Sequence, residues 1–414
     1  MRREAIIASA LVVLAPRAHG QEVDARLMTL LSGHADPRDG HVYSVVPAYQ
    51  SITLSASELT VPFLDDVRLM ASGWGEVVLG DPAPGTSPSA DLDLGFIEAR
   101  TWKRRVELRL GRQIISGGAA RMTPMDGLSA KVTLGPLALT TYGGAPVTPR
   151  FGISRGDAMA GARLAYRSGT ETEIAASVID VLDDGRAARQ DVAVDARYGF
   201  VKQLFITEYA LFSLRELRFA EASAAIAWQP TLDGQATFEY RRTAPDLFLP
   251  RTSVLSVFSQ ETRDELGGTI FWRPFHALRL SGDARVLFVE DGTGARASGK
   301  LAYGSPGERD AGLELRVLHE PSSGFAEARL FGLQKIGDGG LVTIDLDGYW
   351  LEKAINGQQL SLTATATAGW QLAPVWRVVV TGLCDMTPLV AWRGEVMVKV
   401  VYNPMMHVHQ KGSP

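Results

Sequence analysis

The chain has 414 residues, of which 46% are hydrophobic and 21% are charged, and its formal net charge is −4. This hydrophobic content excludes a disordered chain. The slightly acidic balance, with no basic stripe that carries aromatic residues, argues against a nucleic-acid partner. The single cysteine, Cys384, excludes an internal disulfide framework, and no CxxC or CxxCH motif is present to bind a metal or haem.

The first twenty residues have the three-part layout of an export signal. Arg2 and Arg3 precede the apolar residues 5–15, and small residues follow at 18 and 20, ahead of a cut before Gln21. An apolar run of about 11 residues is too short to cross a membrane as a helix. Residues 1–20 are therefore predicted to be a secretory signal peptide.

Residues 21–40 carry a weaker pattern. Val23, Leu27 and Leu30 follow a loosely helical spacing, and the segment ends in polar sequence that contains Pro37. We predict a short periplasmic lead-in here.

Residues 359–371 show the pattern that dominates the rest of the chain. One parity is apolar throughout: Leu360, Leu362, Ala364, Ala366, Ala368 and Trp370. The positions between them hold Gln, Ser, Thr or Gly, so a period of two places the sets on opposite faces of a β-strand. The alternation lasts about 11–13 residues, roughly twice the typical globular strand. It meets the roughly 9–11 residues that a tilted strand needs to cross a bilayer.

The same alternation recurs from residue 67 to residue 402, with charges kept to one face of each strand. Lipid requires a closed sheet with an apolar outer band and a polar interior. We therefore predict an all-β fold, a single transmembrane antiparallel β-barrel over residues 41–402, with a C-terminal tail over 403–414. About 20 strands are expected, within a range of 18–22, because Pro47 interrupts the pattern of residues 41–59. A secreted, soluble all-β binding protein is the alternative, and the long apolar faces argue against it.

The connections between these strands alternate in length over the first half of the chain. Long connections fall at residues 80–90, 116–125, 143–157, 182–190 and 243–263, and short ones at 103–104, 135–136, 168–169 and 201–202. Long outer loops and short periplasmic turns are typical of outer-membrane barrels. The short connection at residues 215–216 breaks the rule. An even strand number places both termini on the periplasmic side.

Charged side chains on the inward face are the candidate pore-lining residues. They are Arg105, Glu107, Arg109, Arg112, Arg121, Asp283, Arg285, Glu314, Arg316, Glu327, Arg329, Asp345, Asp347 and Asp385. The early members are mostly basic and the late ones acidic, which favours a transverse field across a pore wide enough to hold water. In the alternative interpretation, neighbouring charges neutralise each other across strands, at about 0.2–1 kcal/mol per pair.

Residues 243–261 form an unusually apolar connection. An exposed outer loop of this composition would be prone to aggregation, which favours a segment folded into the barrel mouth as a constriction. Its candidate residues are Asp246, Phe248, Arg251 and Phe258. Alternatively, the segment continues two strands above the membrane.

Signals for catalysis are poor. No GxSxG motif is present, and among the histidines of the mature chain only His319, beside Glu320, lies where a polar site could form. We predict no enzymatic activity, no catalytic residue, no metal site and no cofactor.

A local motif adds a family resemblance. GRQ at residues 111–113 is followed by DGL at residues 126–128, and in this the chain resembles porin-type outer-membrane β-barrels of Gram-negative bacteria, among them the alginate-export barrels. The resemblance implies an outer-membrane location, contact with outer-membrane lipid and passive diffusion of small hydrophilic or charged solutes. The alternative is a barrel that acts as a sheath or anchor for a periplasmic or secreted partner and conducts little. One departure is that the chain continues past Tyr402 to Pro414, whereas such barrels usually end on an aromatic residue.

Overall fold

The computed structural model describes residues 22–38, 41–59, 61–80, 87–147, 157–169, 171–247, 262–321, 323–389, 392–403 and 405–407. The predicted signal peptide, residues 1–20, lies outside these ranges. The strands are β1 (Glu22–Arg38), β2 (His41–Leu59), β3 (Asp66–Gly80), β4 (Ser89–Thr101), β5 (Val106–Ser116), β6 (Met122–Leu134), β7 (Leu137–Pro146), β8 (Ala158–Ser168), β9 (Thr172–Asp183), β10 (Arg186–Val201), β11 (Leu204–Ser213), β12 (Arg218–Thr231), β13 (Gly234–Thr243), β14 (Arg263–Phe275), β15 (Leu278–Val289), β16 (Gly292–Ser305), β17 (Arg309–His319), β18 (Gly324–Ile336), β19 (Gly340–Ile355), β20 (Gln358–Ala373), β21 (Trp376–Met386), β22 (Arg393–Tyr402) and β23 (Met405–His407). Two 3₁₀ turns, η1 (Gly118–Ala120) and η2 (Pro245–Leu247), lie between strands. None of the helical elements in these ranges has the length and apolar character to cross a membrane.

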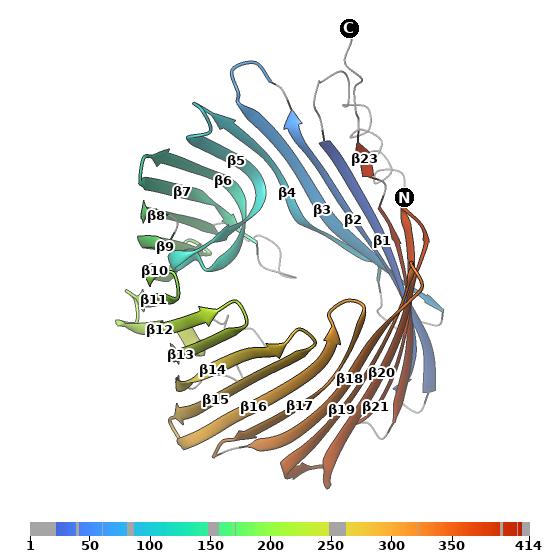
Figure 1. Cartoon of the computed structure of the whole chain (residues 1–414). Coiled ribbons are helices and arrows are strands. Elements are labelled where there is room, and N and C mark those ends of the chain that lie inside the picture. Colours follow the sequence, from blue (N-terminus) through green and yellow to red (C-terminus); the bar gives the residue numbers. More distant parts are fainter. Residues whose placement is uncertain are drawn as a thin grey trace.

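The strands form one closed antiparallel sheet (Figure 1). Each strand from β1 to β21 pairs with the next in sequence, and β1 also pairs with β22, with Leu27 opposite Tyr402 and Gly33 opposite Val396. Across this seam the Ser32 hydroxyl donates to the Glu395 carboxylate. The predicted all-β single barrel is confirmed, and its 22 strands fall within the expected range.

The structure differs from the expectation at the two ends of the barrel. Residues 21–40, expected as a lead-in, contain β1, the strand that closes the ring. Met28 and Leu30 are apolar residues on the inward face of β1. They weaken the alternation of apolar and polar residues that marks a strand in the sequence. In the segment expected as a tail, β23 extends the line of β22 and pairs with Glu22–Asp24 of β1.

The exposed faces identify the outside of the ring. In β20 the apolar parity is the exposed one, with Leu362 46% and Trp370 51% exposed, whereas Thr363 and Thr367 are half-buried. A soluble sheet would show the opposite order, because its apolar face would be buried in a core. The apolar band therefore faces outward, as a lipid-facing band does.

The two ends of the barrel differ in their connections. We call one the short-turn end, because turns such as residues 135–136, 202–203 and 374–375 lie there. The other is the long-loop end, with connections such as residues 147–157 and 244–262. β1 begins and β22 ends at the short-turn end, and the expected asymmetry holds for most of the first half. The long connection expected at residues 182–190 is wrong, because β9 and β10 pair through this stretch and leave only residues 184–185 as the turn. The asymmetry weakens in the second half, where residues 290–291 and 356–357 are short connections at the long-loop end.

Exposed aromatic side chains gather near strand ends. At the short-turn end, the rings of Trp376 and Tyr402 lie 4.5 Å apart between centroids, and Trp370 and Trp272 are also exposed. Trp350 occupies the opposite end of β19. Such rings favour the headgroup level of a bilayer.

Candidate channel interior

A line of glycines across neighbouring strands allows the hairpin of β5 and β6 to bend away from the barrel wall. Gly111 has φ +122°, and a Cβ there would lie 2.2 Å from the carbonyl oxygen of Gly95. Added Cβ atoms would lie 2.3 Å from the Gly143 oxygen at Gly127 and 2.2 Å from the Asp126 oxygen at Gly144. Because only glycine tolerates such backbone approach, β4 to β7 can bend sharply along this line. Figure 1 shows β5 and β6 curving toward the barrel interior.

The GRQ and DGL motifs hold this bend. Arg112 and Asp126 are directly opposite in the register, and the Arg112 Nε donates to the Asp126 carboxylate at 2.8 Å. The fully buried Gln113 amide donates to the Gly127 carbonyl at 3.1 Å, and its oxygen accepts from the Ser129 hydroxyl at 2.7 Å. The GRQ and DGL motifs therefore have a structural role: their hydrogen bonds fix the bend of the sheet at the base of the β5–β6 hairpin.

The tip of the hairpin, η1, is fastened to the inner wall. The Ala119 N–H donates to the Ser177 hydroxyl at 2.8 Å, and the Tyr209 hydroxyl donates to the Gly118 carbonyl at 3.1 Å. The Arg189 guanidinium donates to the Ala119 carbonyl at 2.6 Å. These partners belong to β9, β10 and β11, so the tip reaches across to a different part of the ring.

An apolar cluster completes this attachment. Ile115, Ala119, Ala120 and Met125 of the hairpin pack with Tyr142, Met159, Ile179, Ala193, Leu211 and Ala220 of the wall. We call these hydrogen bonds and this cluster the hairpin latch. Its apolar cluster is buried inside the ring, and the latch narrows the interior on one side.

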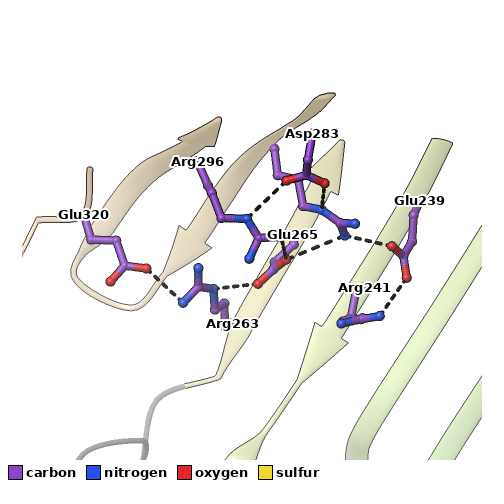
Figure 2. Close-up of polar contacts among 8 residues, drawn as sticks. Glu239, Arg241, Arg263, Glu265, Asp283, Arg296 and Glu320 are labelled. Carbon is purple, nitrogen blue, oxygen red and sulfur yellow. Dashed lines mark hydrogen bonds and ion pairs between the residues drawn. The ribbon is translucent and has the colours of Figure 1, made fainter. Parts of the chain in front are cut away.

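An ion-pair network covers the inner face of β13 to β16 (Figure 2). Arg285 lies at its centre, with its side chain 9% exposed, 2.8 Å from Glu239 and 2.9 Å from Asp283. Arg296 approaches Asp283 at 3.3 Å and Glu265 at 3.6 Å. At the edge of the network Arg263 joins Glu265 and Glu320, each at 2.9 Å.

A second network continues along β16 to β19. Arg316 pairs with Glu314 at 2.5 Å and with Glu327 at 3.3 Å. Arg329 pairs with Asp345 and lies 3.7 Å from Glu314. A pocket of about 500 Å³ opens beside both networks and is lined by Asp283, Lys300, Glu314, Arg316 and Arg329 among others.

The early wall is paired in the same way. Arg109 lies 2.5 Å from Glu98, whose side chain is 2% exposed, and 3.4 Å from Glu107. Arg100 reaches the same Glu98 at 2.8 Å. In each of these walls, basic side chains contact acidic ones. This is the interpretation in which neighbouring charges neutralise each other, and not the one in which a basic wall faces an acidic wall.

The remaining candidate residues are scattered. Arg105 lies in the turn after β4, with its guanidinium 5.7 Å from the Trp102 ring. Arg121 ends the hairpin tip and pairs with Glu221 of β12 at 2.8 Å. Asp385 pairs with Arg393 at 2.7 Å, and Asp347 accepts from the Tyr349 hydroxyl at 3.4 Å.

The expected constriction segment is described only at its start. Asp246 falls within η2, and Leu247, the last residue of η2, packs against the apolar cluster of the latch. The side chain of Asp246, and the residues Phe248, Arg251 and Phe258, lie outside the described ranges. Within the described ranges, an element that folds inward is η1. The run of small residues at 117–120 was its available sequence signal.

Within the described ranges, no three His, Cys, Asp or Glu side chains lie together as a possible metal site. No known family matches the sequence, and no curated protein matches it. Among solved structures, the translocation pore of the P pilus usher PapC is similar over 93% of this chain and 99% of that chain, with a TM-score of 0.52 and 10% identity.

Two Pseudomonas aeruginosa structures are also similar. For OpdL the coverage is 94% of this chain and 99% of that chain, with a TM-score of 0.47 and 13% identity. For OpdK with vanillate it is 93% and 98%, with a TM-score of 0.47 and 11% identity. At such identities a likeness concerns the fold alone, and of these three structures the usher alone scores above 0.5. The chain therefore has the fold of a single closed β-barrel of 22 antiparallel strands, similar to that of the usher translocation pore.

Proposed function

We propose that the chain is a passive, water-filled channel for small hydrophilic or charged solutes in the outer membrane of a Gram-negative bacterium, with no catalytic role. Export by the signal peptide of residues 1–20 belongs to the same proposal. N-terminal sequencing of the mature protein tests this part, and a mature chain that does not begin at Gln21 would contradict it.

One observation carries the proposal: the ring is apolar outside and charged inside. Leu346 and Ala366 belong to the outward face, whereas Asp345 and Thr365, their neighbours in sequence, belong to the inward one. A barrel with 22 strands leaves a wide lumen, and the hairpin latch occupies one side of it. The ionic side chains along the wall then provide the polar surface that a hydrated solute requires.

The decisive experiment is single-channel recording. Purified mature protein, inserted in a planar lipid bilayer, is expected to give stable open steps in symmetrical KCl, and a salt gradient then gives the ion selectivity. A protein that inserts, as shown by heat-sensitive migration of the folded barrel, yet never conducts would refute the channel.

A matched pair of cysteine variants tests which face lines the pore. In a Cys384→Ser background, a charged thiol reagent added from the water phase should label Thr365→Cys rapidly and reduce its conductance. The adjacent Ala366→Cys, on the lipid-facing parity, should react slowly and leave the conductance unchanged. Equal labelling of the two variants would contradict the proposed lining.

The constriction expected in residues 243–261 stays a prediction. Deleting residues 248–261 should raise the single-channel conductance if the segment narrows the pore. An unchanged conductance would favour its alternative, a segment above the membrane.

A further inference from the structure

At the short-turn end, where β1, β20, β21 and β22 meet, the inner wall contains a second pocket of about 390 Å³. We call it the mouth pocket. Its lining includes three cationic side chains, Arg26, Arg377 and Lys399, and two amides, Gln371 and Asn403.

The charge of the mouth pocket is not balanced. None of its described lining residues is a carboxylate, and Arg26, Arg377 and Lys399 make no ion pair among the described residues. Asp24 lies on the same face of β1 as Arg26, two residues away, and it neither lines the pocket nor forms an ion pair there. Arginines of both ion-pair networks, in contrast, contact carboxylates directly.

The strand register brings the three cations together. Arg377 is opposite Val401 and Lys399 is opposite Val379, so the two cations are diagonal neighbours, on the order of 7–8 Å apart at the backbone. Arg26 enters from β1 on the other side of β22. Long cationic side chains from three strands therefore converge on one space.

Hydrogen bonds order the lining of the mouth pocket. The Gln371 side-chain oxygen accepts from the Arg377 Nε at 3.2 Å, which orients the guanidinium and leaves its terminal nitrogens available. The Asn403 N–H donates to the Val375 carbonyl at 2.9 Å and fixes the end of β22 against the β20–β21 turn.

We propose that the mouth pocket is a binding site for a small oxyanion, a carboxylate or a phosphate. A guanidinium presents paired N–H donors that match two oxygens of such a group, and an ammonium adds a compact positive charge. This site rests on the proposed function in one respect: solutes must be able to reach the barrel mouth. Ligand binding in the mouth pocket does not, however, require that the pore conduct.

Calorimetric titration of the folded, detergent-solubilised barrel tests the site directly. Sodium phosphate and disodium succinate are the two probes, at constant ionic strength, and they distinguish a phosphate ligand from a carboxylate ligand. Arg377→Gln and Lys399→Gln should each weaken the binding of the preferred probe by about tenfold or more, since each removes a charge-assisted contact. Arg68→Gln is the matched control: its side chain is on the inward face of β3, makes no ion pair among the described residues and lies outside the pocket.

The outcomes separate the site from the channel. Binding that weakens in both pocket variants but not in Arg68→Gln supports the site, whether or not the protein conducts. Absence of binding by the wild-type barrel overturns it, and so does an equal loss in the control, which would indicate only a diffuse positive field. A conducting barrel that binds neither probe would leave the channel standing and remove the site.

Discussion

The hairpin latch permits a quantitative test of what holds the interior in place. The double variant Ser177→Ala with Tyr209→Phe removes two of its hydrogen bonds and leaves its apolar contacts in place. Removing the Ser177 hydroxyl leaves the buried Ala119 N–H unpaired, which costs about 1–3 kcal/mol, and the Tyr209 bond contributes about 1 kcal/mol. The sum, about 2–4 kcal/mol, corresponds to a rise of roughly 30-fold to several-hundred-fold in the undocked fraction of the tip.

Native-state hydrogen exchange measures that fraction without reference to conductance. Peptides that cover residues 114–122 should exchange faster in the double variant, in proportion to the undocked fraction, while peptides from β19 and β20 keep their wild-type rates. The matched control is Ser361→Ala with Tyr349→Phe. It also deletes one serine and one tyrosine hydroxyl, but in the opposite part of the ring, where these groups donate to the Met386 carbonyl and the Asp347 carboxylate.

Two results would refute the reasoning. Wild-type exchange rates in the double variant would show that the hydrogen bonds do not fix the tip. An equal effect of the control pair would show a general loosening of the barrel. A parallel bilayer recording should show more frequent conductance transitions in the double variant, because a tip that leaves the wall changes the open cross-section.

Three further predictions concern folding and stability. Gly127→Val should sharply reduce the yield of folded barrel, because its Cβ would clash with backbone, whereas Gly382→Ala, which meets open space, should fold normally in lipid vesicles. Leu346→Arg on the lipid face should lower the free energy of unfolding in urea by about 2–4 kcal/mol, and the lumen-facing Thr365→Arg by much less. Glu98→Gln should cost on the order of 3 kcal/mol in the same assay, because it leaves two arginines beside a nearly buried neutral side chain; a change below about 0.5 kcal/mol would contradict the importance of that contact.

Much of the wall could be predicted from the sequence because the period of two is a local property. In β20 the polar face is made of small hydroxyl and amide residues, so the assignment of inside and outside needs no knowledge of other strands. β1 was missed for the same physical reason: apolar side chains on its inward face removed the contrast on which the prediction depends.

The interior was less predictable because it depends on which strands become neighbours. Lists of charges per strand suggested two walls of opposite sign, but the pairing of Glu98 with Arg109, or of Asp345 with Arg329, requires the register between strands. The inward hairpin requires more, since Gly95, Gly111 and Gly127 act only when they are aligned across the sheet. The small residues at 117–120 gave a weaker sequence signal for folding inward than the apolar residues of 243–261.

The closure of the ring by its first and last strands has a consequence for biogenesis. The contacts between β1 and β22 join residues from opposite ends of the sequence, among the most distant pairs the chain can make. Contacts of this kind form late, since their loop-closure entropy is paid before they give any stabilisation. A nascent chain that has not yet supplied residues 393–402 presents two open sheet edges, β1 and β21, each able to pair with another polypeptide. Pairing of β22 with both β1 and β21 removes these two edges, and this pairing is the event that ends their exposure.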